Sequence, residues 1–253
     1  MSATITASQI QLKPELLDQT VVVIGGSSGI GLETARRARA QGARLILAGR
    51  KSEPLQRAAS EVDALSTKAF DTTDPAPLAQ FFRELPGPID HVMVTAGRPY
   101  YGRLIDMDSA QASRALSERF LLFLDIARNA ASKMRPGGTV IFMGDASGRR
   151  PAVGNGAEST VAVALTALIA NLALEVAPVR VNLIAAGFVD SPLSASVLGD
   201  QLEDRRKQLR TTLPIRRVIE PADVAALAVH IMINTALTGG TYDIDGGQQF
   251  VDT

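Results

Sequence analysis

The sequence contains no cysteine and only two histidines among its 253 residues. Without cysteine there is no disulfide, no thiolate metal site and no thiol nucleophile. His91 begins an apolar run and His230 lies within an apolar helical pattern, so we expect both to be structural. A metal site built on imidazole ligands is therefore not expected, and we predict no bound metal.

The sequence also lacks net charge, because 26 Lys and Arg residues balance 26 Asp and Glu residues. A balanced net charge gives no reason to expect nucleic acid or an anionic membrane as a partner. The N-terminal segment has no basic start followed by an apolar run, so it does not resemble a secretory signal. We expect no stretch long and apolar enough to span a bilayer, and hence a cytoplasmic protein with a small-molecule substrate.

What the sequence does have is enough apolar material for a large core. Hydrophobic residues make up 46% of the chain and charged residues 21%. This length suits one large α/β domain, and we find no internal repeat or linker that would divide it. We therefore expect a single domain over residues 1–253, with a mobile helical lid segment at about 190–212.

Short apolar runs alternate with helical patterns along the chain, which predicts βαβ units and a parallel sheet. The first run, TVVVI, is continuously β-branched and apolar, as expected for a strand buried on both faces. Strands are expected at 20–24, 44–48, 68–70, 91–95, 139–143, 180–184 and 241–244. Helices are expected at 29–41, 52–62, 74–84, 109–134, 158–176, 191–212 and 221–234. With right-handed crossovers, these elements form an α/β Rossmann-type fold with a doubly wound, seven-stranded parallel sheet and helices on both faces.

A glycine-rich loop in VVVIGGSSGIGLETARR joins the first strand to the first helix. Gly25, Gly29 and Gly31 let the backbone turn sharply and approach a ligand closely. The N-terminus of the following helix then presents free N–H groups and a positive dipole end to a pyrophosphate. The alternative is a glycine-rich turn without a ligand. The order of strand, loop and helix favours a nucleotide site.

This loop resembles the fingerprint of the short-chain dehydrogenase/reductase family, and the likeness extends over nearly the whole chain. Thr95-Ala96-Gly97 stands where the family has Asn-Ala-Gly. VNLIAAGFVDSPL resembles the family's strand, turn and lid entry, with Ala186 in place of the usual proline, and LTGGTYDIDGG resembles its closing strand. The resemblance places Asp71 beside an adenine. It implies a nucleotide site formed by Gly25, Ser27, Ser28, Gly29, Ile30, Gly31, Arg50, Lys51, Asp71, Thr72, Thr95, Ala96, Gly97, Gly187 and Val189.

The end of the second strand, LAGRK, indicates which nucleotide binds. Enzymes that use NAD place an acidic residue near this point, where it accepts hydrogen bonds from the ribose hydroxyls. Here Gly49 is followed by Arg50 and Lys51, and a guanidinium can grip a 2′-phosphate in a bidentate fashion. Ser27 or Ser28 can add a hydroxyl donor. The alternative is that Arg50 is a solvated loop charge; we predict NADP(H).

The family's catalytic Asn–Ser–Tyr–Lys set is not found at the corresponding positions. Counted back from LALEVAP, the tyrosine position falls on Glu158 and the lysine position on Ala162. The serine position falls on Asp145, with Ser147 close by, and the asparagine position falls near Ala115. The resemblance therefore implies the fold and the cofactor more directly than it implies the usual alcohol–ketone chemistry.

Two carboxylates and two tyrosines are the candidates for a substitute proton-transfer site. Glu158 can serve as acid or base, and if Asp145 also faces the nicotinamide, repulsion and burial raise one carboxyl pKa. Anionic charge there would favour the oxidised ring, and hence oxidation or tight NADP⁺ binding. The alternative is that Asp145 caps a turn and Glu158 only begins a helix, where acids are favourable.

Tyr100 and Tyr101 follow the fourth strand, at the sheet edge where ligands bind in this fold. No tyrosine lies between Tyr101 and Tyr242, so a small shift of register cannot restore the family's set. Either tyrosine can act as a donor or a stacking surface for a substrate. The alternative is that they pack under the lid or at a subunit contact.

We predict an NADP(H)-dependent oxidoreductase acting on a small carbonyl, alcohol or activated alkene through a rebuilt site of Glu158, Asp145, Ser147, Tyr100 and Tyr101. Two alternatives remain: an inactive NADP(H) sensor or scaffold subunit, and a lyase or isomerase that uses the two carboxylates. The helix at 158–176 is apolar nearly all round. In the resembling family this helix and the final strand form subunit interfaces, which implies a homodimer or homotetramer.

Overall fold

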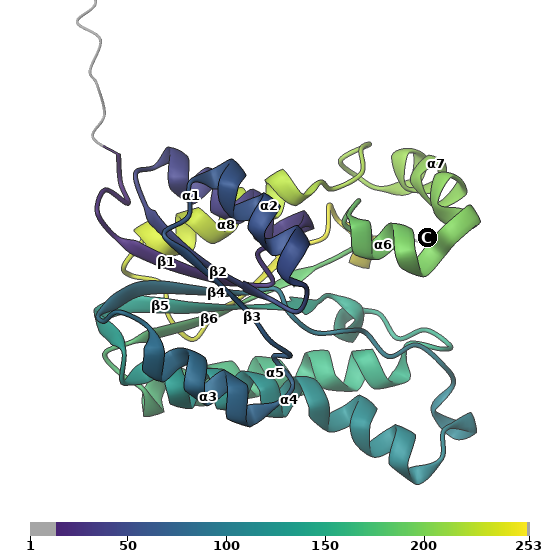
Figure 1. Cartoon of the computed structure of the whole chain (residues 1–253). Helices are drawn as coiled ribbons and strands as arrows, with labels where there is room; N and C mark the ends of the chain where they lie inside the picture. Colours follow the sequence, from purple (N-terminus) through teal and green to yellow (C-terminus); the bar gives the residue numbers. More distant parts are fainter. Residues whose placement is uncertain (1–13, 252–253) are drawn as a thin grey trace, which may run out of the picture.

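The structure is a computed structural model that describes residues 14–251, and its centre is one seven-stranded sheet (Figure 1). The strand order is β3-β2-β1-β4-β5-β6-β7, and every neighbouring pair is parallel. The predicted doubly wound parallel sheet is confirmed. The strands are β1 (Thr20–Ile24), β2 (Arg44–Gly49), β3 (Ser66–Ala69), β4 (Ile89–Val94), β5 (Met134–Asp145), β6 (Arg180–Ala186) and β7 (Thr241–Ile244).

Helices cover both faces of the sheet, as Figure 1 shows. One layer contains α1 (Gly29–Ala40), α2 (Ser52–Val62) and α8 (Pro221–Ile233), and the other contains α3 (Pro75–Glu84), α4 (Ser109–Ala131) and α5 (Gly156–Glu175). Strand side chains alternate between the faces. Val22 and Ile24 of β1 join one core cluster, whereas Val21 and Val23 join the other. Both faces are therefore buried, which explains why the central strands are continuously apolar.

Several element boundaries differ from the predicted ones by a few residues, and the differences at α4 and β3 have a clear physical cause. The helix expected to reach residue 134 ends at Ala131, and Met134 already belongs to β5, where it pairs with Ile89. The RPGG sequence that follows cannot continue a helix, because proline lacks an N–H and glycine is a poor helix former. The third strand lies at 66–69 rather than 68–70; it is an edge strand without a fully buried residue, so no apolar run marks its position.

The lid is two helices rather than one. α6 (Pro192–Leu198) and α7 (Leu202–Thr212) are separated by the short 3-10 helix η3 (Gly199–Gln201). Gly199 has a φ of 50°, a left-handed conformation that ends α6. Both helices lie beyond the carboxyl ends of the strands (Figure 1). The other 3-10 helices are η1 (Leu104–Asp106), η2 (Ser147–Arg149) and η4 (Gln248–Phe250).

Helix α5 is long and apolar enough to cross a membrane by length and composition, so the expectation that no stretch qualifies was wrong. Its 18-residue window has a mean hydropathy of 1.6, and 44% of that window is buried inside the protein. Val161, Leu165 and Ile169 belong to the core beneath the sheet. This burial accounts for the apolar composition of α5 without a bilayer.

Candidate active site

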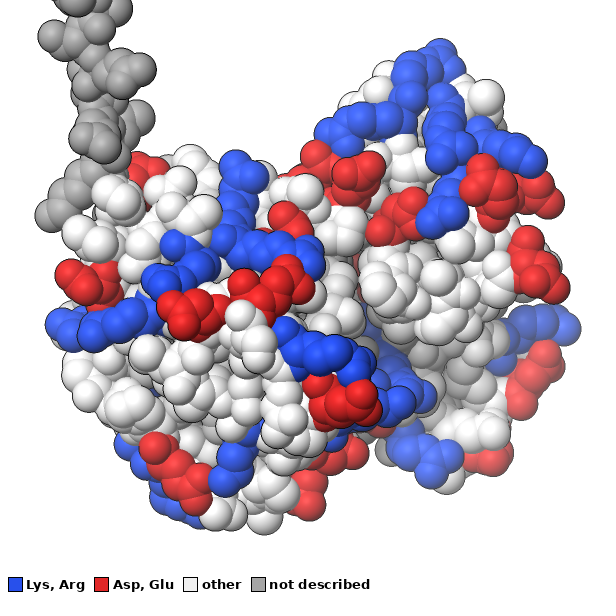
Figure 2. Space-filling view, turned by 45° about the horizontal axis from the view of Figure 1, so that its top comes forward, with Lys and Arg blue, Asp and Glu red and all other residues white. Residues whose placement is uncertain are grey.

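A pocket of about 750 Å³ opens at the carboxyl ends of β4, β5 and β6, beneath the lid helix α6. Its walls are the segments that follow these strands, the N-terminal turn of α5 and residues of α6 and α7. In Figure 2 the lid forms a separate lobe, with a recess between it and the rest of the molecule. The pocket therefore lies where ligands bind in open parallel sheets.

The glycine loop is packed tightly against β4. A Cβ on Gly25 would lie 2.3 Å from the Thr95 hydroxyl oxygen, and one on Gly31 would lie 2.2 Å from the Gly25 carbonyl oxygen. Glycine is therefore required at both positions by the fold itself. At Gly29 the requirement is conformational, because its φ is 53° and its nearest neighbour, Pro192 of the lid, would be 3.4 Å from a Cβ.

The first turn of α1 is open to an anion. It carries no acidic residue, and the Ser28 side chain makes no capping hydrogen bond. The Leu32 N–H donates to the Ser28 carbonyl at 3.2 Å, which leaves the N–H groups of Gly29, Ile30 and Gly31 without an acceptor among the described residues. This is the arrangement that binds phosphate at helix N-termini. The residues present fit the pyrophosphate of a dinucleotide.

The end of β2 bears no carboxylate. Gly49 is buried, Arg50 is exposed, and the Ser27 hydroxyl oxygen would lie 3.8 Å from a Cβ on Gly49. Hydrogen bonds from the backbone and hydroxyl of Thr73 hold the pKa of Asp71 below its ordinary value, and the charge of Arg50 adds to this effect. Ser27 and Asp71 therefore both lie near the end of β2, where Arg50 stands.

The predicted nucleotide residues divide into two groups. Ile30, Thr95, Ala96, Gly97, Gly187 and Val189 line the pocket. The remaining residues do not line this pocket and lie in or next to α1, β2 and β3. They are Gly25, Ser27, Ser28, Gly29, Gly31, Arg50, Lys51, Asp71 and Thr72. Of these, Thr72 is only 4% exposed, which leaves little of its surface for a ligand.

Arg119 of α4, which was not predicted as a site residue, contacts three segments around the site. Its Nη1 lies 3.2 Å from Asp145 Oδ2 and 2.9 Å from Glu158 Oε2. Its Nη2 donates to the backbone carbonyl of Arg98 at 3.2 Å. The asparagine position was placed near Ala115, but Ala115 is buried and does not line the pocket; Arg119, one helical turn further on, does.

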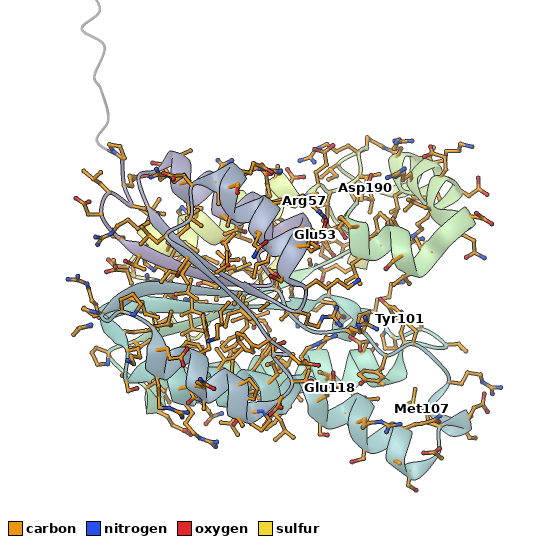
Figure 3. All side chains as sticks on the ribbon, in the orientation of Figure 1. Glu53, Arg57, Tyr101, Met107, Glu118 and Asp190 are labelled. Atoms are coloured by element: carbon orange, nitrogen blue, oxygen red, sulfur yellow. The ribbon has the colours of Figure 1, made fainter. Side chains whose placement is uncertain are left out.

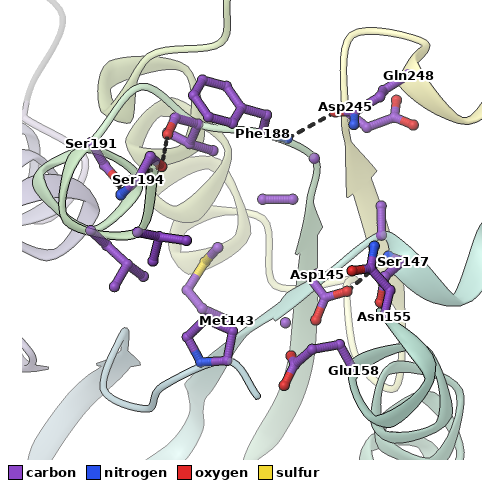
Figure 4. Close-up of a pocket in the computed structure, with 18 of the residues that line it drawn as sticks. Met143, Asp145, Ser147, Asn155, Glu158, Phe188, Ser191, Ser194, Asp245 and Gln248 are labelled. Carbon is purple, nitrogen blue, oxygen red and sulfur yellow. Dashed lines mark hydrogen bonds between the residues drawn. The ribbon is translucent and has the colours of Figure 1, made fainter. Parts of the chain in front are cut away.

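Asp145 and Glu158 lie close together at the base of the pocket (Figure 4). Asp145 ends β5, and its Oδ1 accepts a hydrogen bond from the Ser147 N–H at 2.8 Å. Glu158 lies in the first turn of α5, and its Oε1 accepts a 2.6 Å hydrogen bond from the Tyr100 N–H. Asp145 therefore caps a turn, as its alternative interpretation proposed, and also faces Arg119 and the pocket.

Burial raises the pKa of Glu158, whose residue is only 3% exposed. The Arg119 charge and the Tyr100 N–H oppose this shift, and the neighbouring Asp145 charge reinforces it. The shift remains upward, because desolvation of a carboxylate is costly and Arg119 is shared with Asp145. The structure thus contains a carboxyl group that retains its proton more readily than an exposed glutamate.

Ser147 supplies a hydroxyl to the same region. Its Oγ is buried and has no hydrogen-bond partner within residues 14–251, whereas its carbonyl accepts from the Ser159 hydroxyl at 3.1 Å. A buried hydroxyl without a partner is costly, so a ligand that supplies one would bind favourably. Ser147 is therefore well placed to contact a substrate oxygen.

The two tyrosines occupy different places. Tyr101 lines the pocket between the lid above and α4 and α5 below (Figure 3). Burial raises its pKa, and Glu158 and Asp145 add to the shift, so this phenol is not activated for proton transfer. The Tyr100 hydroxyl instead donates to Glu118, and Tyr100 does not line the pocket. Tyr100 thus contributes its backbone N–H to Glu158 rather than the predicted side chain.

These features define a doubly wound α/β protein with a nucleotide-type crevice, and comparison with known proteins identifies its family. A family model described as enoyl-(acyl carrier protein) reductase matches residues 24–249. An uncharacterized oxidoreductase of Mycobacterium tuberculosis is 30% identical over 251 residues, which cover 92% of this chain and 93% of that protein. The chain belongs to the short-chain dehydrogenase/reductase family of oxidoreductases.

Other relatives are more distant but equally complete. The short-chain dehydrogenase/reductase ATR9 of Stachybotrys chlorohalonatus is 27% identical, over 92% of this chain and 98% of that protein. The structure of BdcA in complex with NADPH is 25% identical, with a TM-score of 0.81 over 92% of this chain and 95% of BdcA. The MalC reductase/Diels-Alderase of Malbranchea aurantiaca has a TM-score of 0.86 over 93% and 98% of the two chains; at 23% identity it shows the shared fold alone.

Proposed function

We propose that this protein is an NADP(H)-dependent oxidoreductase that reduces a small carbonyl compound or activated alkene, with Glu158 as the proton donor. The observation that carries this proposal is a buried carboxyl of raised pKa at the base of the pocket, 2.9 Å from Arg119. A general acid needs a pKa near the working pH and a position within reach of the reacting atom. Glu158 meets the first condition better than Tyr101, whose pKa is raised.

NADP(H) is supported by the open first turn of α1 and by Arg50 at the end of β2. BdcA, a relative of the same fold, has been solved with NADPH, which adds to the case. The glycine loop with Ile30 would hold the pyrophosphate, and Ser27 with Arg50 would hold the 2′-phosphate. When bound, the reduced nicotinamide would supply the hydride.

The residues of this chain would then handle the proton and the substrate oxygen. The Ser147 hydroxyl donates a hydrogen bond to the oxygen, and Glu158 gives it a proton. The resulting Glu158 carboxylate is stabilised by Arg119 and by the Tyr100 N–H, both already in place. Asp145 holds Arg119 and, through the Ser147 N–H, the turn that carries Ser147.

This arrangement changes the expected direction of reaction. Oxidation of the substrate was expected because Asp145 and Glu158 together would make the site anionic. Arg119 pairs with both carboxylates, and a protonated Glu158 carries no charge, so the cluster becomes close to neutral. The electrostatic reason to favour NADP⁺ disappears, and a carboxyl that holds its proton suits reduction.

The proposal is tested first by calorimetric titration of the protein with NADPH and NADH, and then by hydride transfer from 4-deuterated NADPH to a panel of carbonyl compounds and activated alkenes. We expect tighter binding of NADPH than of NADH, and deuterium in at least one product. Glu158→Gln should slow that transfer by roughly 10²–10⁴-fold while NADPH still binds. NADPH binding without transfer to any compound would instead support the sensor or scaffold function, and turnover without nucleotide would support the lyase or isomerase.

A further inference from the structure

The lid helix α7 carries four cationic side chains, and three of them are paired with acids. The pairs are Arg206 with Asp190 at 2.6 Å, Arg210 with Glu203 at 3.3 Å, and Lys207 with Asp204 at 3.7 Å. The fourth, Arg205, has no acidic partner within residues 14–251; its Nη1 donates to the neutral amide oxygen of Gln208 at 2.8 Å. Arg205 is thus the one cation of α7 that has no acidic partner among the described residues.

Among these four cationic side chains of α7, Arg205 is the one that lines the pocket. Burial lowers the pKa of its guanidinium, and the charge of Arg150 lowers it further. Arg150 follows η2, lines the same pocket and donates to the backbone carbonyl of Val251. Arg205 is therefore a partly buried cation on the pocket wall, where burial of a guanidinium without an acidic partner is costly.

None of the acids that line the pocket pairs with Arg205. Asp145 and Glu158 are engaged by Arg119. Asp245 accepts hydrogen bonds from the N–H groups of Gly247 at 2.8 Å and Gln249 at 2.9 Å, so it caps the turn that leads to η4. The missing partner of Arg205 is therefore an anion that the described chain does not itself supply.

We propose that the lid side of the pocket is a subsite for an anionic group of the substrate, a carboxylate or a phosphate, bound by Arg205. The reductive step rests on the proposed function. Together, that function and the anionic subsite define the substrate class. The substrate carries a carbonyl or activated alkene at the Glu158 end and an anionic oxygen group at the lid end. Phe188, Leu193 and Val197 line the same pocket, which suits an apolar segment between the two ends.

The geometry favours this use of arginine. A guanidinium presents a planar fork of N–H donors that matches both carboxylate and phosphate oxygens. Arg205 lies on α7, in the lid lobe, whereas Glu158 begins α5 on the opposite side of the sheet edge (Figures 1 and 4). An anion held by Arg205 would draw the lid toward the substrate and orient its far end toward Glu158.

The subsite is tested by calorimetric titration of the full chain, without nucleotide, with glutarate, glycerol 3-phosphate and the uncharged glutaramide at constant ionic strength. We expect one of the two anions to bind and glutaramide not to bind. Arg205→Gln should weaken that binding roughly tenfold or more, as loss of a charge-assisted hydrogen bond does. The anion that binds more tightly identifies the group as carboxylate or phosphate.

Arg210→Gln is the matched control, because Arg210 lies on the same helix but is half-exposed and paired with Glu203. It should leave anion binding unchanged, and circular dichroism should confirm that both variants fold. Binding of neither anion by the wild-type chain, equal losses in both variants, or a loss in Arg50→Gln but not in Arg205→Gln would overturn the subsite. Failure of NADPH to bind would contradict the proposed function alone, since the anion titrations use no nucleotide.

Discussion

One buried carboxyl, that of Glu158, makes the rate of the proposed reduction dependent on pH. Because burial raises its pKa, Glu158 is protonated at pH values where an exposed glutamate is ionised. If Glu158 donates the proton, the rate of reduction is highest below this raised pKa and falls as pH rises through it. Single-turnover rates with NADPH between pH 5 and 9 should show this fall. Glu158→Gln should lower the rate by roughly 10²–10⁴-fold, the usual worth of a general acid, and remove the inflection. The same inflection in Glu158→Gln would assign it to another group.

Arg119 opposes the shift at Glu158, so its removal has a predictable sign. With Arg119→Gln, burial and the Asp145 charge act on Glu158 without a cation to offset them. We expect the pKa of Glu158 to rise further and the inflection in the rate profile to move to higher pH. Arg128→Gln, on the same helix but exposed and paired with Asp125, is the control that should leave the profile unchanged. An inflection that moves to lower pH would contradict this role for Arg119.

Arg50 determines nucleotide preference if it binds the 2′-phosphate. Arg50→Gln should weaken NADPH binding roughly 10–100-fold, because a charge-assisted hydrogen bond is lost, and should leave NADH binding unchanged. Calorimetric titration of both nucleotides measures the change. Arg57→Gln is the control, since Arg57 on the neighbouring α2 is exposed and paired with Glu53. Equal weakening of NADPH and NADH binding would show that Arg50 does not recognise the 2′-phosphate.

At the scale of elements, Arg180 fastens α8 to the sheet. This buried guanidinium donates to the carbonyl oxygens of Gly137, Ile231, Met232, Asn234 and Leu237. Most of these belong to the last turn of α8 and the residues after it, where carbonyls have no partner within the helix. Burial and the Arg180 charge also lower the pKa of His91 to about 3, so His91 stays neutral, which fits the structural role expected for it.

Arg180→Met should therefore destabilise the protein by roughly 3 kcal/mol or more, because several buried acceptors would lose their donor at once. Urea unfolding followed by circular dichroism measures the free energy of unfolding. Arg135→Met is the control: Arg135 is about half-exposed and pairs with Asp90, and such a pair contributes only about 0–1 kcal/mol. Similar losses in the two variants would contradict the role given to Arg180.

At the scale of the whole molecule, α4 and α5 present exposed apolar side chains. Val163 and Leu174 of α5 are 57% and 80% exposed, and Leu121 of α4 is 51% exposed. The two helices pack against each other, so these side chains lie on one helical layer. Apolar surface of this kind marks interaction sites, and it supports the homodimer or homotetramer that the family resemblance implies.

Mass measurement in solution should therefore give a dimer or tetramer. Val163→Glu should shift the measured mass toward that of a smaller oligomer or the monomer, because the substitution would bury a charge in the interface. Leu65→Glu serves as the control, because Leu65 is equally exposed, at 61%, but lies next to the edge strand β3. A monomer in the wild-type protein, or no change in Val163→Glu, would reject this interface.

The fold and the nucleotide crevice could be predicted before the structure was known, because both are encoded in local sequence patterns. Continuous apolar runs specify buried parallel strands, and Gly25, Gly29 and Gly31 specify the turn into α1. The replacement of the family's tyrosine by Glu158 was also visible in the sequence, because α5 follows a recognisable apolar pattern.

The contacts among the replaced residues could not be predicted in this way, because they form between distant parts of the folded chain. On α4, Arg119 looks like any surface arginine, and its contacts with Asp145 and Glu158 join residues 26 and 39 positions away in the chain. The position of Arg205 on the pocket wall depends in the same way on the fold of the lid over β5 and β6. Charges interact through space, and the distances and burial that set their pKa values exist only once the chain has folded.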